Sequence, residues 1–185
     1  AALGALPQVG HGGVRQADGP AGTPGQAAGA GVGSGAADGE GTAPIDRGPE
    51  PDKVYEQVLT EERLDAWLAR IEAAELVSFD TETTSLDPSR AELVGIALSV
   101  TPHEACYIPV AHRYAGVPDQ LDRELVLGRL RRWLESPDPA KVGQNLKYDM
   151  HVLANHGIAF AGLAHDTLLQ SYVLEAHRSH GMDAL

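Results

Sequence analysis

The chain has 185 residues, a formal net charge of −12 and a single cysteine, Cys106. The negative charge argues against a generic basic surface for nucleic acid, although metal ions and a few local cations can still hold phosphate. One cysteine excludes a disulfide framework and fits a reducing compartment. No stretch is apolar enough to span a membrane and the first residue is not Met, so we expect a cytoplasmic segment of a longer protein.

Residues 1–50 differ in composition from the rest of the chain. They contain 14 of the 21 glycines and no aromatic residue. Such a segment cannot bury enough apolar surface to offset the entropy lost on ordering. The composition therefore predicts a disordered Gly/Ala/Pro-rich linker over residues 1–50 and a folded domain over residues 51–185.

The first half of the folded part predicts a strand, a helix and three further strands. Thr60 is a candidate N-cap for the helix that follows the first strand. Short, turn-rich connections join the three later strands, which predicts an antiparallel meander. The four predicted strands are residues 54–59, the apolar run that opens the stretch 76–86, and residues 93–100 and 105–110.

The second half alternates helices with short strands. An amphipathic helix follows Asp122, and a helix capped by Asn145 ends at Gly157. Asp166 is the candidate cap of a last helix over residues 167–175. Two further strands are predicted over residues 141–144 and 159–164. The order of elements predicts an α/β fold with a mixed sheet flanked by helices.

Two acids follow a short apolar run at the end of the second predicted strand. Because side chains alternate along a strand, Asp80 and Glu82 project from one face while Phe79 and Thr81 project from the other. Neighbouring carboxylates repel each other unless a proton or a cation lies between them, and a hard divalent metal suits oxygen ligands. A simpler alternative is that Asp80 only starts a turn or caps a helix.

A third acid lies within an apolar helical stripe. Asp149 falls among Leu146, Met150 and Leu153, and an unpaired buried carboxylate is costly. A hydrogen bond, an arginine or a metal shared with Asp80 and Glu82 would each supply a partner.

Three sequence motifs resemble those of a known family. The segments 79–83 (Phe-Asp-Thr-Glu-Thr), 107–112 (Tyr-Ile-Pro-Val-Ala-His) and 142–149 (Val-Gly-Gln-Asn-Leu-Lys-Tyr-Asp) closely resemble the proofreading 3′–5′ exonuclease domain of the bacterial DNA polymerase I family. The likeness covers about residues 52–185, in the same order and at similar spacing. It implies membership of the DEDD exonucleases and a ribonuclease H-like fold, here incomplete at the C-terminus.

The resemblance also implies roles for individual residues. Asp80, Glu82 and Asp149 match metal-binding carboxylates of the family. Four other residues match positions that contact the single-stranded 3′ end: Leu86, Gln144, Asn145 and Tyr148. Two plainer readings stay open, in which Leu86 is ordinary core and Asn145 is only an N-cap.

The implied reaction uses two divalent ions, with Mg²⁺ favoured and Mn²⁺ or Zn²⁺ as alternatives. Two ions about 4 Å apart would clamp the terminal phosphodiester of single-stranded DNA and release nucleoside 5′-monophosphates. The implied partners are the 3′ end of DNA and the polymerase and 5′-nuclease domains of the same parent chain, in the bacterial nucleoid.

One family feature is missing. The family completes its site with a tyrosine and an aspartate spaced Tyr-x-x-x-Asp, whereas Tyr172 is followed four places later by Ala176. We therefore expect little exonuclease activity from this chain alone. Two alternatives remain: an inactive domain that only braces a polymerase, and a related 3′–5′ exoribonuclease.

Overall fold

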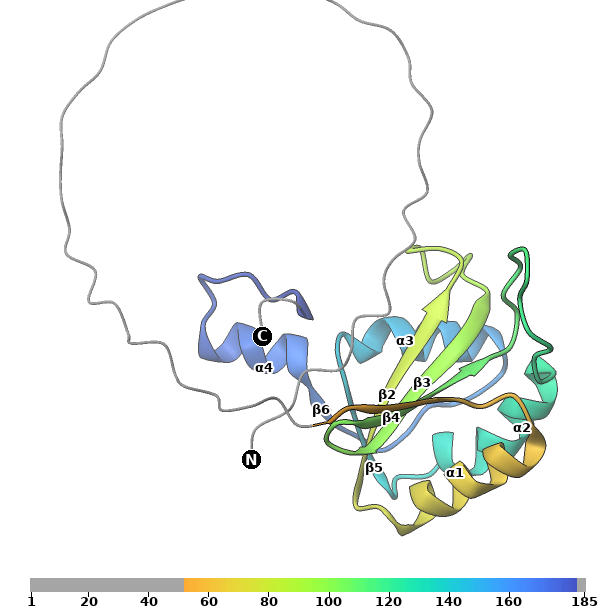
Figure 1. Cartoon of the computed structure of the whole chain (residues 1–185). Helices are drawn as coiled ribbons and strands as arrows, with labels where there is room; N and C mark the ends of the chain where they lie inside the picture. The colour runs from red at the N-terminus through yellow and green to blue at the C-terminus, as the bar shows by residue number, and fades with distance from the viewer. Residues whose placement is uncertain (1–51, 183–185) are drawn as a thin grey trace, which may run out of the picture. The chain divides into compact units, whose positions relative to one another are not determined.

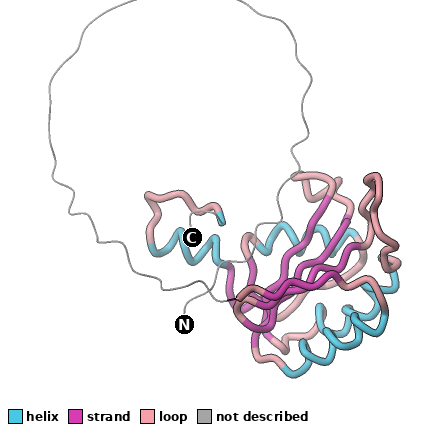
Figure 2. Tube along the Cα trace, in the orientation of Figure 1, coloured by secondary structure: helices cyan, strands magenta, loops and turns pink. Residues whose placement is uncertain are grey.

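The computed structural model describes residues 52–182, and the linker predicted over residues 1–50 lies outside that range. The described part contains six strands and four helices, and three of the strands, β2 to β4, follow one another directly (Figures 1 and 2). Their bounds are β1 (Val54–Gln57), α1 (Glu61–Ala73), β2 (Leu76–Thr83), β3 (Leu93–Thr101), β4 (Glu104–Pro109), α2 (Arg123–Leu134), β5 (Ala140–Gly143), α3 (Leu146–Asn155), β6 (Leu163–Asp166) and α4 (Thr167–Leu174). None of these helices combines the length and apolar character that a membrane crossing requires.

The six strands form one mixed sheet in the order β1-β4-β3-β2-β5-β6. Strands β2, β3 and β4 pair antiparallel, which confirms the predicted meander. Strand β1 pairs parallel with β4, and β5 pairs parallel with both β2 and β6. The strand order places β2, which carries the acidic pair, near the middle of the sheet between an antiparallel and a parallel neighbour.

The last strand begins later than the sequence predicts. Residues 159–162 form a connection rather than the start of β6, because the Ala161 N–H donates to the Leu134 carbonyl at the end of α2. Gly162 then turns the chain at φ +75°, and a Cβ at this position would lie 2.5 Å from the Pro137 carbonyl oxygen. The close contact with α2 thus delays sheet pairing until Leu163.

Side chains on β2 alternate between the two faces of the sheet. Phe79 and Thr81 are buried, at 0% and 7% exposure, and the Phe79 ring meets the edge of Trp133 from α2 at 5.9 Å between centroids. The apolar cluster on this face includes residues of α1, α2 and α3, and Figure 1 shows α1 and α2 side by side against the sheet. Asp80 and Glu82 project from the opposite face and are only half-buried, as the alternation predicts.

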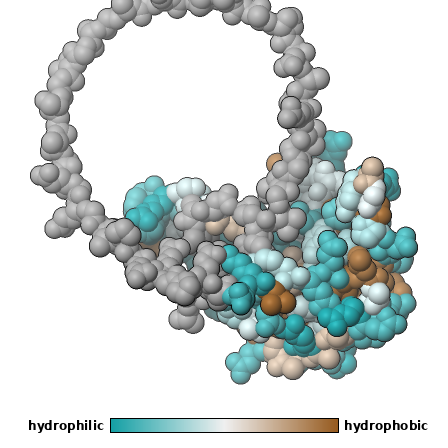
Figure 3. Space-filling view, viewed as in Figure 1, coloured by the Kyte–Doolittle hydropathy of each residue, from teal (hydrophilic) through white to brown (hydrophobic). Residues whose placement is uncertain are grey.

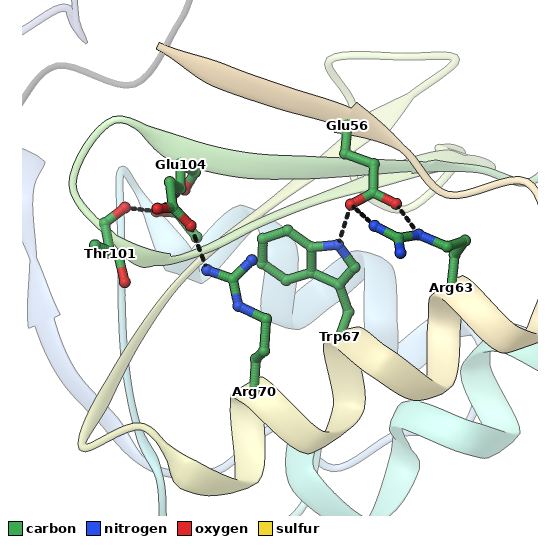
Figure 4. A network of polar contacts seen from close by, with 7 residues as sticks. Glu56, Arg63, Trp67, Arg70, Thr101 and Glu104 are labelled. Carbon is green, nitrogen blue, oxygen red and sulfur yellow. Dashed lines mark hydrogen bonds and ion pairs between the residues drawn. The ribbon is translucent and has the colours of Figure 1, made fainter. Parts of the chain in front are cut away.

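A polar network joins the edge strand β1 and the β3–β4 turn to α1 (Figure 4). Glu56 accepts hydrogen bonds from the Arg63 guanidinium and from the Trp67 indole N–H, the latter at 3.1 Å. Arg70 lies over the Trp67 ring at 4.2 Å and donates to Glu104 on β4 at 2.6 Å. Each carboxylate of this network therefore has a guanidinium partner.

Helix α4 contrasts with the other three helices because it has no buried residue. Its exposed apolar side chains include Leu169, Val173 and Leu174, with exposed fractions of 61%, 86% and 81%. The view in Figure 3 shows a mainly hydrophilic surface interrupted by apolar patches.

Candidate active site

Asp80 is influenced by the negative charges of two other acids. Burial, the charge of Asp149 and the charge of Glu82, in that order of importance, raise the pKa of Asp80 from 3.8 to about 7. Among residues 52–182, no lysine or arginine forms an ion pair with any of these three acids. The fold therefore keeps Asp80 as an electrostatically uncompensated carboxylate on the more open face of the sheet.

Asp149 is held from the opposite side of β2. Its side chain is 2% exposed, and its Oδ1 atom accepts hydrogen bonds from the Thr81 N–H at 2.9 Å and the Thr81 hydroxyl at 2.6 Å. Burial raises the pKa of Asp149 to about 6, although these two bonds act to lower it. Thr81, the residue between Asp80 and Glu82, is thus a hydrogen-bond partner of the kind that the sequence predicted for Asp149.

The start of α3 differs from the expected N-cap. Asn145 occupies the cap position in the left-handed region, at φ 58° and ψ 44°, but its side chain makes no capping bond. Asp166 takes that role from β6, since its carboxylate accepts from the N–H groups of Asn145 at 3.1 Å and Leu146 at 2.9 Å. The prediction that the Asn145 side chain caps α3 is wrong, and this side chain is left at an exposed position.

The same carboxylate also caps α4. Asp166 accepts from the N–H groups of Leu168 at 3.0 Å and Leu169 at 3.3 Å, which confirms its predicted capping role. One buried aspartate therefore fixes the first turns of two helices, including the helix that carries Asp149.

Leu86 lies in the loop after β2 and is 96% exposed. The reading of Leu86 as a core residue is therefore wrong. The Tyr148 hydroxyl donates to the Ser85 carbonyl and is hydrogen-bonded to the Thr83 hydroxyl. Tyr148 thus ties α3 to the loop that presents Leu86.

The side-chain amide of Gln144 makes two hydrogen bonds within the chain. Its Nε2 atom donates to the His180 carbonyl at 2.8 Å, and its Oε1 atom accepts from the Thr167 hydroxyl. Both ends of the amide are thereby engaged, and its predicted contact with a nucleic-acid strand stays a prediction.

The three acids fit a divalent ion by donor chemistry, since they offer hard oxygen atoms and uncompensated charge. In the part of the chain that the structure describes, no three His, Cys, Asp or Glu side chains are already arranged as a metal cage. Of the three acids, Asp80 is the one whose pKa the charges of both others raise.

Sequence reasoning assigned no role to two residues of the 107–112 motif, Tyr107 and His112. Tyr107 pairs with Ala97, which in turn pairs with Asp80, so all three side chains lie on one face. The Tyr107 hydroxyl and the His112 Nε2 atom are 2.5 Å apart. The motif over residues 107–112 contained both residues, but periodicity could not show that the tyrosine reaches toward the acids.

Strand β2 and its acids lie within the match to a known family. The family model described as "3'-5' exonuclease" matches residues 55–185, and the chain belongs to this family. DNA polymerase I of Pseudomonas aeruginosa is 49% identical over 150 residues, which cover 80% of this chain and 16% of that protein. DNA polymerase I of Rhizobium leguminosarum is 43% identical over 141 residues, 66% of this chain and 14% of that protein. The chain thus spans about one sixth of the length of these relatives.

Solved structures with the same fold include the Pol1 polymerase domain from M. smegmatis in complex with DNA primer-template and dNTP. The TM-score is 0.52 at 22% identity, over 66% of this chain and 20% of that one. This likeness concerns the fold alone. It confirms the ribonuclease H-like α/β class that the sequence predicted.

Proposed function

We propose that this chain is the proofreading segment of a DNA polymerase I and takes part in removing nucleotides from the 3′ end of single-stranded DNA. The observation that carries the proposal is that Asp80 and Glu82 share one face of β2 and, like Asp149, form no ion pair with a lysine or arginine among residues 52–182. A structural ion pair would place a cation there, whereas a site for divalent ions and phosphate needs free carboxylates. The family membership and the 49% identical polymerase support the same reading.

Asp80, Glu82 and Asp149 would hold the divalent ions, with Mg²⁺ as the favoured species. Such ions, when bound, lower the pKa of a water ligand and neutralise charge on the phosphodiester. Thr81 fixes the Asp149 carboxylate through its two hydrogen bonds, so that acid keeps one orientation.

Leu86 and Asn145 would meet the end of the strand. An exposed leucine beside the acids can pack against the terminal base, because stacking and apolar contact tolerate any sequence. Asn145 presents its side chain from a left-handed backbone position that Asp166 stabilises. Gln144 and Tyr148 support the same region from β5–α3, and Tyr148 holds the loop of Leu86.

The test uses the full-length polymerase that would carry this segment. We expect that polymerase to act in the bacterial cytoplasm. Asp80→Ala should abolish release of mononucleotides from single-stranded DNA in Mg²⁺ and leave polymerisation intact. Asp87→Ala is the matched control, because the carboxylate of this exposed acid, in the loop after β2, accepts hydrogen bonds from Ser89, and the variant should keep full activity. Normal proofreading by Asp80→Ala would show that the assigned centre is wrong.

A second variant tests the strand contact. Leu86→Ala should weaken binding of the 3′-terminal nucleotide while metal binding stays intact, which a fluorescent 3′-labelled strand would report. The same assay with RNA separates the alternatives, since faster trimming of RNA than of DNA would favour an exoribonuclease.

A further inference from the structure

The side chain of Tyr107 crosses the neighbouring strand at the one residue that leaves room for it. A Cβ atom on Gly95 would overlap the Tyr107 hydroxyl oxygen. Gly95 pairs directly with Glu82 across β2 and β3. Because the Cβ atoms of residues paired across strands lie about 5 Å apart, the hydroxyl occupies a position about that far from the Glu82 Cβ, within reach of the Glu82 carboxylate.

His112 holds the hydroxyl in this position. Its Nε2 atom lies 2.5 Å from the Tyr107 oxygen, and the two rings are 5.7 Å apart between centroids. The backbone of His112 is itself fixed, because the Gln120 amide accepts from its N–H at 2.8 Å and donates to its carbonyl at 3.0 Å. His112, three residues after the end of β4, is therefore held in place to support the Tyr107 hydroxyl.

The charges determine the direction of this hydrogen-bond chain. The tyrosine hydroxyl has one proton to donate and can also accept. A tyrosine hydroxyl is protonated at neutral pH, because its ordinary pKa is about 10, and a carboxylate can only accept its proton. A histidine that carries its proton on Nε2 donates to the tyrosine oxygen and leaves the tyrosine proton for Glu82.

We propose that Tyr107, oriented by His112 and admitted by Gly95, is a positioning residue that donates a hydrogen bond to Glu82 and fixes this carboxylate for divalent-ion binding. This inference rests on the proposed function, because it assumes that Glu82 is a metal ligand. Carboxylate ligands are commonly oriented by such hydrogen bonds, and removing the outer partner typically costs 10–100-fold in metal affinity or activity.

The first test measures metal binding in the 185-residue chain, without catalysis. Tyr107→Phe removes only the hydroxyl and should weaken Mn²⁺ binding about tenfold in calorimetry or electron spin resonance. Tyr55→Phe, on the edge strand β1, is the matched control and should bind Mn²⁺ like the wild-type chain. Equal Mn²⁺ affinity for Tyr107→Phe and the wild-type chain would overturn the proposal.

Two further variants separate positioning from folding. His112→Asn should weaken Mn²⁺ binding, and its effect should not add to that of Tyr107→Phe, because both act through the one hydrogen bond from Tyr107 to Glu82. Gly95→Ala should displace the tyrosine ring and reproduce the loss even though Tyr107 is present. Additive losses, or loss of Mn²⁺ binding only in step with a lowered melting temperature, would show a structural role and overturn the proposal.

Activity of the full-length polymerase distinguishes this inference from the proposed function. Tyr107→Phe should lower the rate on single-stranded DNA by about tenfold at a Mg²⁺ concentration below saturation, with little change in KM for the DNA. If Asp80→Ala is inactive while Tyr107→Phe is fully active, the function stands and the role of Tyr107 fails. If Asp80→Ala is active, or if the wild-type chain binds no Mn²⁺, the metal centre itself is wrong and the inference fails with it.

Discussion

Two groups of acids in this molecule have opposite electrostatic surroundings. Glu56, on the edge strand β1, accepts hydrogen bonds from Arg63 and Trp67, and these contacts hold the pKa of its carboxyl below the usual range (Figure 4). Asp80, on the central strand β2, lies near two like charges, and burial together with those charges raises its pKa to about 7. The same chemical group is thus stabilised as an anion in one place and destabilised in the other.

The difference separates acids that hold the fold together from acids that are available for chemistry. A paired carboxylate on the surface contributes modestly to stability and has no free charge to offer. An unpaired, partly buried carboxylate costs stability, and such perturbed groups cluster at functional sites.

Asp80→Asn should remove the cost of burying a negative charge beside two like charges, while keeping the shape of the side chain. At pH 8 the free energy of unfolding of the metal-free chain should rise by about 4 kcal/mol, because the folded pKa lies about three units above the ordinary value. The raised pKa means that this cost is complete above pH 7 and absent below about pH 4, where both states are protonated. Urea unfolding at pH 4 and pH 8 measures the difference, and an equal gain at both values would contradict the electrostatic cause.

Asp166→Ala should have the next largest effect, in the opposite direction. Asp166 is a buried acid stabilised by four backbone N–H groups rather than by a cation. Its loss should lower the free energy of unfolding by about 3 kcal/mol, because two helices lose their caps and buried donors lose their acceptor. Asp122→Ala is the control, since this exposed acid caps only α2 and should cost about 1 kcal/mol.

Lys141→Met tests an unpaired charge of the opposite sign. The Lys141 side chain is fully buried, its ammonium donates to the Ser136 and Pro139 carbonyls, and burial lowers its pKa to about 8. The unfolded chain binds more protons at this residue between pH 8 and pH 10.5, so stability rises with pH in that window. The wild-type chain should gain about 2 kcal/mol more than Lys141→Met between pH 7 and pH 10, as thermal unfolding would show. Parallel pH profiles would contradict this prediction.

Glu56→Gln should have the smallest effect, because the network of Figure 4 is largely exposed to solvent. We expect a loss of at most about 1 kcal/mol at pH 7. The loss should shrink as the pH falls through 4.5, since the lowered pKa of Glu56 stabilises the fold only while the group is ionised. Denaturation at low and high salt provides the check, and a loss that is insensitive to salt would point to packing of Trp67 instead.

The acidic pair illustrates how far local sequence reasoning reaches. The alternation of residues 76–83 placed Asp80 and Glu82 on one face and buried Phe79 and Thr81 on the other, as the structure has it. The short connections also predicted the β2–β3–β4 meander, because pairing between strands that follow one another depends on the turns that join them. The family motifs supplied the roles of Leu86, Gln144, Asn145 and Tyr148, which remain proposals.

The cap of α3 shows where that reasoning ends. Asn145 is a good N-cap by local preference, yet Asp166 takes the two N–H groups from 20 or more residues away. A carboxylate buried beside the helix start is a stronger acceptor than a neutral amide, so the tertiary contact overrides the local preference.

Sequence patterns were enough to predict the order of strands and helices, the face of β2 on which each side chain lies, and the family to which the chain belongs. Each of these depends on periodicity or on motifs that are contiguous in the chain. Only the tertiary structure decided that Leu86 is exposed, that Thr81 holds Asp149, and that Tyr107 passes over Gly95 toward Glu82. These contacts join residues that are distant in sequence, and their geometry follows from strand register and helix docking, which no local pattern encodes.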